Sequence, residues 1–213
     1  MSYLSVRFKI LSLVVMFSIA IAVLSITSSI SSRTITNELN QAASNSLELV
    51  KNIEHSRQLL LSQSVEFERG FFQVSLAKSI EGAGTALVSE SHEKFTTYTE
   101  ELKLSFENIR QILSIMPKNN ELTSLLEHID TFNQQQDTFL TATNATYELW
   151  VKLNTFKGAK SRRTAQAVLV EISEQMELIN EALNDYDKSI LAGQKSKQDQ
   201  IAITSVIISA ALI

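Results

Sequence analysis

Hydrophobic residues recur along most of the chain at alternating steps of three and four positions. This spacing is kept over four stretches, at about 33–80, 86–116, 120–156 and 161–200. Steps of three and four place side chains on one face of an α-helix. The pattern therefore predicts four amphipathic helices, each with one stripe of buried side chains.

The stripe of the first stretch shows the pattern and its exceptions. It runs through Leu49, Ile53, Ser56, Leu60, Gln63, Phe67, Gly70 and Val74. In the third stretch Gln136, Thr143 and Thr146 occupy equivalent positions. Polar residues on such stripes either fix the register of a bundle through internal hydrogen bonds or line a small polar ligand site. The sequence leaves both explanations open.

Helix-breaking residues are scarce and fall between the four stretches. The chain has one proline and five glycines. The expected turns are Gly82–Gly84, Pro117–Asn120 and Lys157–Lys160, with Gly158 as a helix C-cap. Short turns join antiparallel neighbours. The predicted fold is all-α, an antiparallel up-down-up-down four-helix bundle.

The most apolar part of the chain is Ile10–Ile30, a run of 21 residues without a charge. A helix of that length crosses a hydrocarbon core about 30 Å thick. A cleaved signal peptide has a shorter apolar core, of about 7–15 residues, and a small-residue cleavage site. We therefore expect a cytoplasmic stub (1–9), a transmembrane helix (10–30) and an external domain (31–200). Arg7 and Lys9 set this orientation.

A second apolar run, 201–213, also lacks charge. It is shorter than the roughly 20 residues of a full crossing. We expect it to be the start of a second, truncated transmembrane helix. The first and last bundle helices would then continue into the membrane from the same end of the bundle.

Composition narrows the possible functions. All 23 acidic residues and all but two of the 19 basic ones lie in 31–200, so this region is acidic and has no electrostatic footprint for nucleic acid. The chain has no cysteine, and no catalytic motif such as HExxH or GxSxG is present. None of the three histidines has the Glu-x-x-His spacing of a di-iron bundle. We expect no catalytic residue, cofactor or metal, and no enzymatic activity.

Four residues are candidates for binding a small anion or amino acid. Arg57 and Arg69 lie on the first predicted bundle helix, more than three turns apart. Arg163 and Thr164 lie where the fourth helix is expected to open, beside free N–H groups and the positive end of the helix dipole. An arginine can pair bidentately with a carboxylate. The alternative for each arginine is a solvated surface charge.

This layout resembles the N-terminal sensory half of bacterial methyl-accepting chemotaxis receptors with four-helix-bundle ligand domains. The stretch from Ser56-Arg57 to Arg69-Gly70-Phe71-Phe72 is similar to the arginine- and glutamate-rich segment of their first sensory helix. The resemblance implies an inner-membrane homodimer with a periplasmic ligand domain. It also implies a ligand held by Arg57, Arg69, Arg163 and Thr164, and a kinase-control module further along the chain.

Three functions fit these expectations. The first is chemosensing, with the last helix shifting against the first when a ligand is bound. The second is the sensor half of a histidine kinase or of a cyclic-dinucleotide enzyme, which share this N-terminal plan. The third is a membrane-anchored helical tether that senses nothing.

Overall fold

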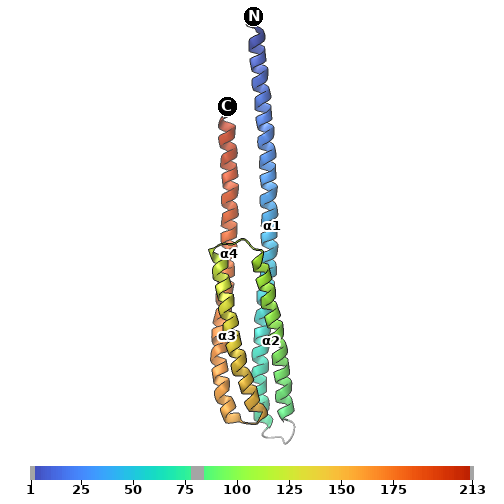
Figure 1. The fold of residues 1–213 in the computed structure, drawn as a ribbon, viewed down its shortest axis with the longest axis vertical. Helices are drawn as coiled ribbons and strands as arrows, with labels where there is room; N and C mark the ends of the chain where they lie inside the picture. The colour runs from blue at the N-terminus through green and yellow to red at the C-terminus, as the bar shows by residue number, and fades with distance from the viewer. Residues whose placement is uncertain (1–2, 78–83, 212–213) are drawn as a thin grey trace. The chain divides into compact units, whose positions relative to one another are not determined.

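The protein folds into long α-helices (Figure 1). The computed structural model describes residues 3–77 and 84–211, and within them the chain forms four helices and no strand. The helices are α1 (Tyr3–Ala77), α2 (Gly84–Ser114), α3 (Asn120–Val151) and α4 (Thr155–Ala211). The number of helices predicted from the sequence is confirmed, but the third helix ends and the fourth begins earlier than predicted. Gly82 and Ala83 of the first predicted turn lie outside the described residues.

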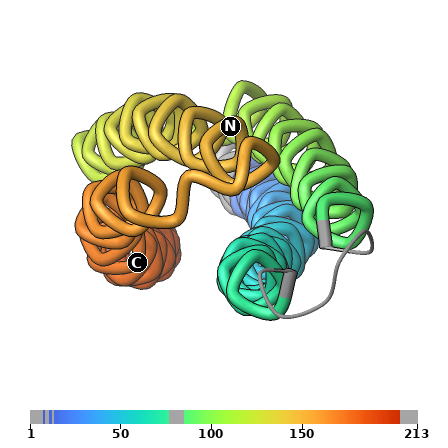
Figure 2. The backbone as a smooth tube through the Cα atoms, turned by 90° about the horizontal axis from the view of Figure 1, so that it is seen from below, coloured from blue at the N-terminus to red at the C-terminus, as the bar shows by residue number. Residues whose placement is uncertain are grey.

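The chain divides into two compact units. Unit 2 is Asn45–Asp187, and unit 1 combines Met1–Ser44 with Lys188–Ile213. Unit 2 therefore contains α2, α3 and the adjoining parts of α1 and α4. Figure 2 shows these helices side by side, with α3 lying between α2 and α4.

The core of unit 2 consists of the predicted stripes. On α1 the stripe positions from Leu49 to Val74 are all buried, including the polar Ser56 and Gln63. The same holds on α3 for the stripe from Leu122 to Trp150. A buried Leu, Ile or Phe side chain contributes about 1.5–3 kcal/mol relative to an exposed one. Burial of these stripes therefore stabilises unit 2.

Hydrogen bonds across the core show the direction of neighbouring helices. Ser56 Oγ donates to Ser105 Oγ (2.9 Å), and Gln63 Nε2 donates to Thr99 Oγ1 (2.6 Å). Positions on α2 fall as positions on α1 rise, so the two helices run in opposite directions. Likewise Gln175 bonds to His128 and Thr146 donates to Ser161, which makes α3 and α4 antiparallel.

The turn between α2 and α3 forms where Pro117 was expected to break the helix. α2 ends at Ser114, and α3 begins at Asn120. The Asn119 side chain caps α3 by accepting a hydrogen bond from the backbone N–H of Leu122 at 2.7 Å. Such a cap satisfies one of the free N–H groups of a helix start. This predicted turn is confirmed.

The predicted turn at Lys157–Lys160 is wrong. α3 ends at Val151, and Leu153 adopts the left-handed backbone conformation, with φ of 53°. The Leu153 N–H donates to the Trp150 carbonyl and the Asn154 N–H to the Leu149 carbonyl, which is the bonding pattern of a Schellman cap. The turn is thus built around a leucine, where glycine is the usual residue.

Gly158, the expected C-cap, lies inside α4 and has a different role. A Cβ atom at this position would stand 2.5 Å from Cδ1 and Nε1 of Trp150, which is fully buried. Gly70 on α1 is similar, because its Cβ would stand 2.7 Å from Cε1 of Tyr147. Both glycines allow a helix backbone to approach the rings of α3. Close packing, rather than a turn, explains Gly158.

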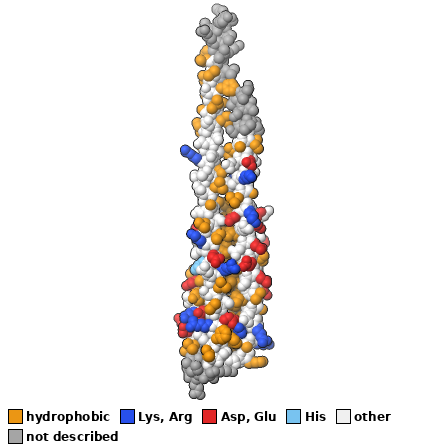
Figure 3. All heavy atoms as spheres, turned by 180° about the vertical axis from the view of Figure 1, so that it is seen from behind, with side chains coloured by type: hydrophobic (Ala, Val, Ile, Leu, Met, Phe, Trp, Pro, Cys, Tyr) orange, Lys and Arg blue, Asp and Glu red, His pale blue; other side chains and the backbone are white. Residues whose placement is uncertain are grey.

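Unit 1 contains the apolar part of α1. Among the described residues, one helix is long and apolar enough to cross a membrane; its best window has a mean hydropathy of 2.1 and no buried residue. A signal sequence would satisfy the same criterion. Figure 3 shows that Lys, Arg, Asp and Glu side chains gather on unit 2 and are sparse on unit 1. For the predicted second span, 201–213, the side chains from 204 onward lie outside the described residues.

Candidate functional site

The two arginines singled out on α1 pair with different carboxylates. Arg57 Nη2 lies 3.2 Å from Glu177 Oε1 on α4, and both side chains are about half exposed or more. Arg69 Nη1 lies 3.4 Å from Glu66 Oε1, one turn earlier on its own helix. The structure therefore places Arg57 and Arg69 in separate environments. Their role in ligand binding stays a prediction.

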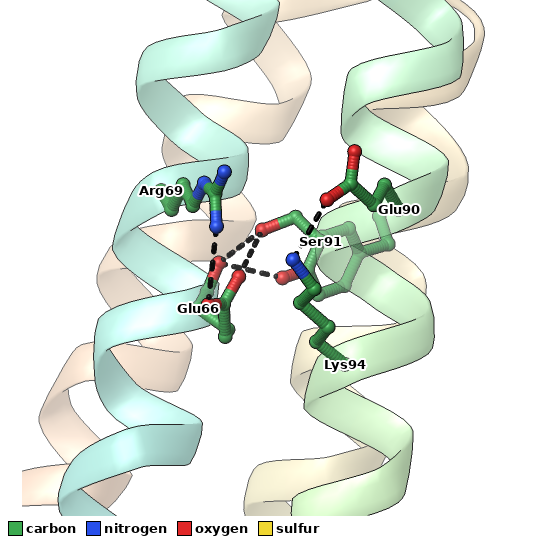
Figure 4. A network of polar contacts seen from close by, with 6 residues as sticks. Glu66, Arg69, Glu90, Ser91 and Lys94 are labelled. Atoms are coloured by element: carbon green, nitrogen blue, oxygen red, sulfur yellow. Dashed lines mark hydrogen bonds and ion pairs between the residues drawn. The ribbon is translucent and has the colours of Figure 1, made fainter.

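Glu66 lies at the centre of a buried polar cluster, which we call the Glu66 cluster (Figure 4). Ser91 Oγ donates to the Glu66 backbone carbonyl (2.7 Å) and to its Oε2 (3.1 Å). Tyr147 Oη donates to the same carbonyl at 3.0 Å. Arg69 lies on its other oxygen, so the carboxylate of Glu66 has partners on both sides, and the Glu66 side chain is only 11% exposed. The Glu66 cluster thus joins α1, α2 and α3.

Aromatic rings surround the Glu66 cluster. The ring of His92 stacks on Tyr147 with centroids 4.3 Å apart, and its Nε2 lies 3.0 Å from Asn144 Oδ1. Phe67 contacts Tyr147 edge to face at 6.0 Å. Burial among these rings raises the pKa of Tyr147 far above its usual range. The phenol therefore stays a neutral hydrogen-bond donor and holds the backbone of α1 in place.

A neighbouring ion pair on α2 lies in solvent. Lys94 Nζ donates to Glu90 Oε1 at 2.7 Å. The hydrogen bond and the charge of Lys94 lower the pKa of Glu90 below its usual value. Both side chains are roughly half exposed, so this pair contributes little to stability. It adds charge beside the Glu66 cluster (Figure 4) but is separate from it.

A second cluster joins α1 to α4 through Glu68. The guanidinium of Arg162 contacts both oxygens of the Glu68 carboxylate through Nε and Nη2. Gln166 Nε2 donates to Glu68 Oε1 at 2.8 Å. The Cζ atom of Arg162 also lies 3.9 Å from the centroid of the Phe71 ring. A bidentate ion pair stacked on an aromatic ring is a strong, directional contact for an arginine.

The fourth helix does not open at Arg163 and Thr164, as the sequence suggested. α4 begins at Thr155, so both residues lie inside it and their N–H groups belong to the helix. Both side chains are exposed, and within 3–77 and 84–211 neither takes part in a hydrogen bond or ion pair. The expected free N–H groups are therefore missing at this position.

The bidentate contact with Glu68 is made by Arg162, the neighbour of Arg163, which was not among the candidate ligand residues. Arg162 and Arg163 are adjacent, so they point about 100° apart around the helix. Ala165 and Ile172 mark the buried face of α4. Arg162, three residues before Ala165, lies beside that face, whereas Arg163 does not. This i, i+3 relation was the signal available in the sequence.

The contacts of Glu66 and Glu68 hold neighbouring helices together. Within the described residues no group of three or more His, Asp or Glu side chains could hold a metal ion. The carboxylates of Glu66 and Glu68 are both engaged by cations. No protein-family model, curated protein or solved structure matches the chain. What the protein does is therefore inferred from its own residues and contacts.

Proposed function

We propose that the chain is the sensory half of a membrane receptor of the chemoreceptor type. In this proposal residues 31–200 form an antiparallel up-down-up-down four-helix bundle on the periplasmic side of a bacterial inner membrane. The main support for this proposal is the continuity of the helix α1. This single helix contains an exposed apolar window in unit 1 and a buried heptad stripe in unit 2. A displacement in the bundle would therefore reach the membrane without crossing a loop.

The bundle is supported by the contacts of unit 2. α1 and α2 are antiparallel, as are α3 and α4. α1 also contacts α4, where Ser46 Oγ donates to Asp187 Oδ2 at 2.8 Å and Arg57 pairs with Glu177. Between these two pairs the residue number rises on α1 and falls on α4, so the two helices run in opposite directions. Four helices that alternate in direction give the proposed up-down arrangement.

The membrane segment is supported by the exposure of apolar side chains in unit 1. Within unit 1, the large apolar side chains of α1 that are at least 49% exposed are Phe8, Leu11, Val14, Val15, Met16, Ile19, Ile21, Val23, Ile26 and Ile30. A contiguous apolar surface of this size marks a contact with lipid or with another protein. Lipid accounts for a helix that is apolar all round.

A reporter fused after residue 40 tests the orientation. Activity of a periplasm-specific reporter such as alkaline phosphatase supports the proposal. A fusion that is active only as a cytoplasmic reporter overturns it. The same fusion with 10–30 deleted is the control, because it should lose periplasmic activity.

A second copy of the chain is the proposed partner. Along α1 of unit 2 a second set of large apolar side chains is 45–63% exposed: Leu47, Val50, Leu61, Val65, Phe72 and Leu76. Most of their spacings are three, four or seven positions, as on the contact face of a coiled coil. In mild detergent the chain should sediment as a dimer, and Leu61→Glu with Val65→Glu should sediment as a monomer. Leu104→Glu on α2 is the matched control.

Ligand sensing distinguishes this function from that of a tether. We expect at least one compound in a panel of amino and organic acids to raise the melting temperature of the full chain in detergent. Binding to the native state must stabilise it by mass action. If no compound shifts the transition, the tether is favoured over both the chemoreceptor and the histidine-kinase sensor.

A further inference from the structure

A cleft lies between α2 and α3 on the surface of unit 2, away from the arginines considered above. Its volume is about 320 Å³, at the small end of the range for ligand sites. Its lining includes Leu102, Phe106 and Phe132, all of which are buried. The Phe106 and Phe132 rings stack with centroids 4.3 Å apart. The cleft therefore has a rigid apolar base.

Charges of both signs border this α2–α3 cleft. Lys103 and Arg110 line it from α2, together with Glu107, and Asp137 lines it from α3. Arg110 is paired with Asp130. Lys103, Glu107 and Asp137 are exposed, and within the described part of the chain their side chains make no ion pair or hydrogen bond. Lys103, the two carboxylates and the guanidinium N–H groups that Arg110 does not use for Asp130 are thus available to a molecule in the cleft.

The cleft also has an amide whose hydrogen-bonding capacity is not fully used. Gln136 lines the cleft, is only 8% exposed, and donates from Nε2 to Gln63 Oε1 at 2.9 Å. Gln63 in turn donates to Thr99 Oγ1, another residue of the lining. The Oε1 atom of Gln136 is buried and accepts no hydrogen bond from any of the described residues. A buried acceptor without a donor is uncommon in native proteins and calls for an explanation.

We propose that the α2–α3 cleft binds a small zwitterion with an apolar body, such as an aliphatic amino acid. Its carboxylate is bound by Lys103 and Arg110, and its ammonium group by Asp137 and Glu107. The apolar body covers the rings of Phe106 and Phe132, and a ligand N–H can supply the donor that Gln136 Oε1 lacks. As the ligand site of a receptor, the cleft rests on the proposed function.

The charge pattern selects this ligand class. A simple anion would lie close to two carboxylates, and a simple cation close to two basic groups, with like-charge repulsion in both cases. A zwitterion places each of its ends beside the opposite charge. Hydrogen bonds to charged groups are about twice as strong as neutral ones. Binding should therefore need both charged ends of the ligand.

The test uses the full chain in detergent, with L-leucine as the probe. Two analogues each lack one charged end: 4-methylpentanoate has no ammonium group, and 3-methylbutylamine has no carboxylate. We expect L-leucine to bind saturably by isothermal titration calorimetry, and each analogue to bind at least about tenfold more weakly. The proposal is overturned by no saturable binding of L-leucine, or by analogues that bind as tightly as it does.

Variants then locate the binding site. Lys103→Gln and Asp137→Asn should each raise the dissociation constant of L-leucine about tenfold. Both side chains are exposed and have no partner among the residues that the structure describes, so the fold should tolerate the changes. Lys51→Gln and Glu181→Gln, which alter exposed charges outside the cleft, are the matched controls. If Lys103→Gln and Asp137→Asn bind as tightly as the controls, the site is elsewhere, and the sensory function survives without this cleft.

Discussion

Replacing Gly158 by alanine should destabilise the protein, against the usual effect of this change in a helix. Alanine is favoured over glycine in helices by up to about 1 kcal/mol. Here the new Cβ would lie 2.5 Å from two atoms of the Trp150 indole, whereas ordinary contacts begin at 3.4 Å. The ring would have to retreat by about 1 Å within a packed core, and such overpacking costs about 1–3 kcal/mol.

When the gain in helix propensity is subtracted from the steric cost, the net effect is a loss of up to about 2 kcal/mol. In a chain of this size that lowers the melting temperature by up to about 8 °C. Trp150 is the only tryptophan of the chain, so its fluorescence reports both unfolding and the displacement of the ring. We expect the fluorescence emission spectrum of the native protein to change and the melting temperature to fall.

Gly193 provides the matched control, since it lies in the same helix and a Cβ there would meet nothing within 4 Å. Gly193→Ala should raise the melting temperature by about 1–3 °C. The reasoning is refuted if Gly158→Ala raises the transition as Gly193→Ala does. That result would mean that the Trp150 ring is not fixed against α4.

Four further predictions concern Leu153, the pair of Arg162 and Glu68, Arg163, and Tyr186. Leu153→Gly should stabilise the protein by about 0.5–1 kcal/mol in thermal unfolding, because glycine adopts a positive φ without strain; a loss of stability would contradict the left-handed turn. Arg162→Glu should lower the free energy of unfolding by about 1–3 kcal/mol, because it places a second negative charge against Glu68. Arg163→Glu should change it by less than about 0.5 kcal/mol and should leave the helical circular-dichroism signal intact. Arg163→Glu should nevertheless abolish any anion-dependent stabilisation if the site predicted from the sequence exists; stabilisation that persists would place that site elsewhere. Burial, and then the charge of Asp187, raise the pKa of Tyr186 to about 12, so its contribution to stability is fully present below about pH 10 and is lost as the pH rises to 12. The phenolate absorbance of the native protein, followed as the pH is raised, should show a titration near pH 12. This titration should be absent from Tyr186→Phe.

The helices and their buried faces could be predicted from the sequence because both depend on local spacing. The positions from Leu49 to Val74 needed only the helical repeat to be recognised as one face. The turn before α4 could not be predicted in this way. Gly158 looked like a helix end, yet its small size serves the packing of Trp150, a contact that becomes visible only when two helices are placed together.

The clusters and the cleft could be predicted only in part, for a related reason. Arg57 and Arg69 were identified by charge, but which carboxylate each would pair with depends on the register of α1 with its neighbours. Lys103 and Asp137 gave no signal in the sequence, because ordinary surface charges have the same spacing. They border one cleft only because α2 and α3 pack in a particular register.

Kinase output in a chimera tests the central claim most directly. Residues 1–213 replace the sensory half of a chemoreceptor whose kinase-control module is retained. The compound that most stabilises the purified chain is then added to membranes containing the chimera. We predict that kinase activity changes at least about fivefold, with a midpoint at the concentration that half-saturates the purified chain. Saturable binding with constant kinase activity would contradict the proposal that this chain transmits a signal across the membrane.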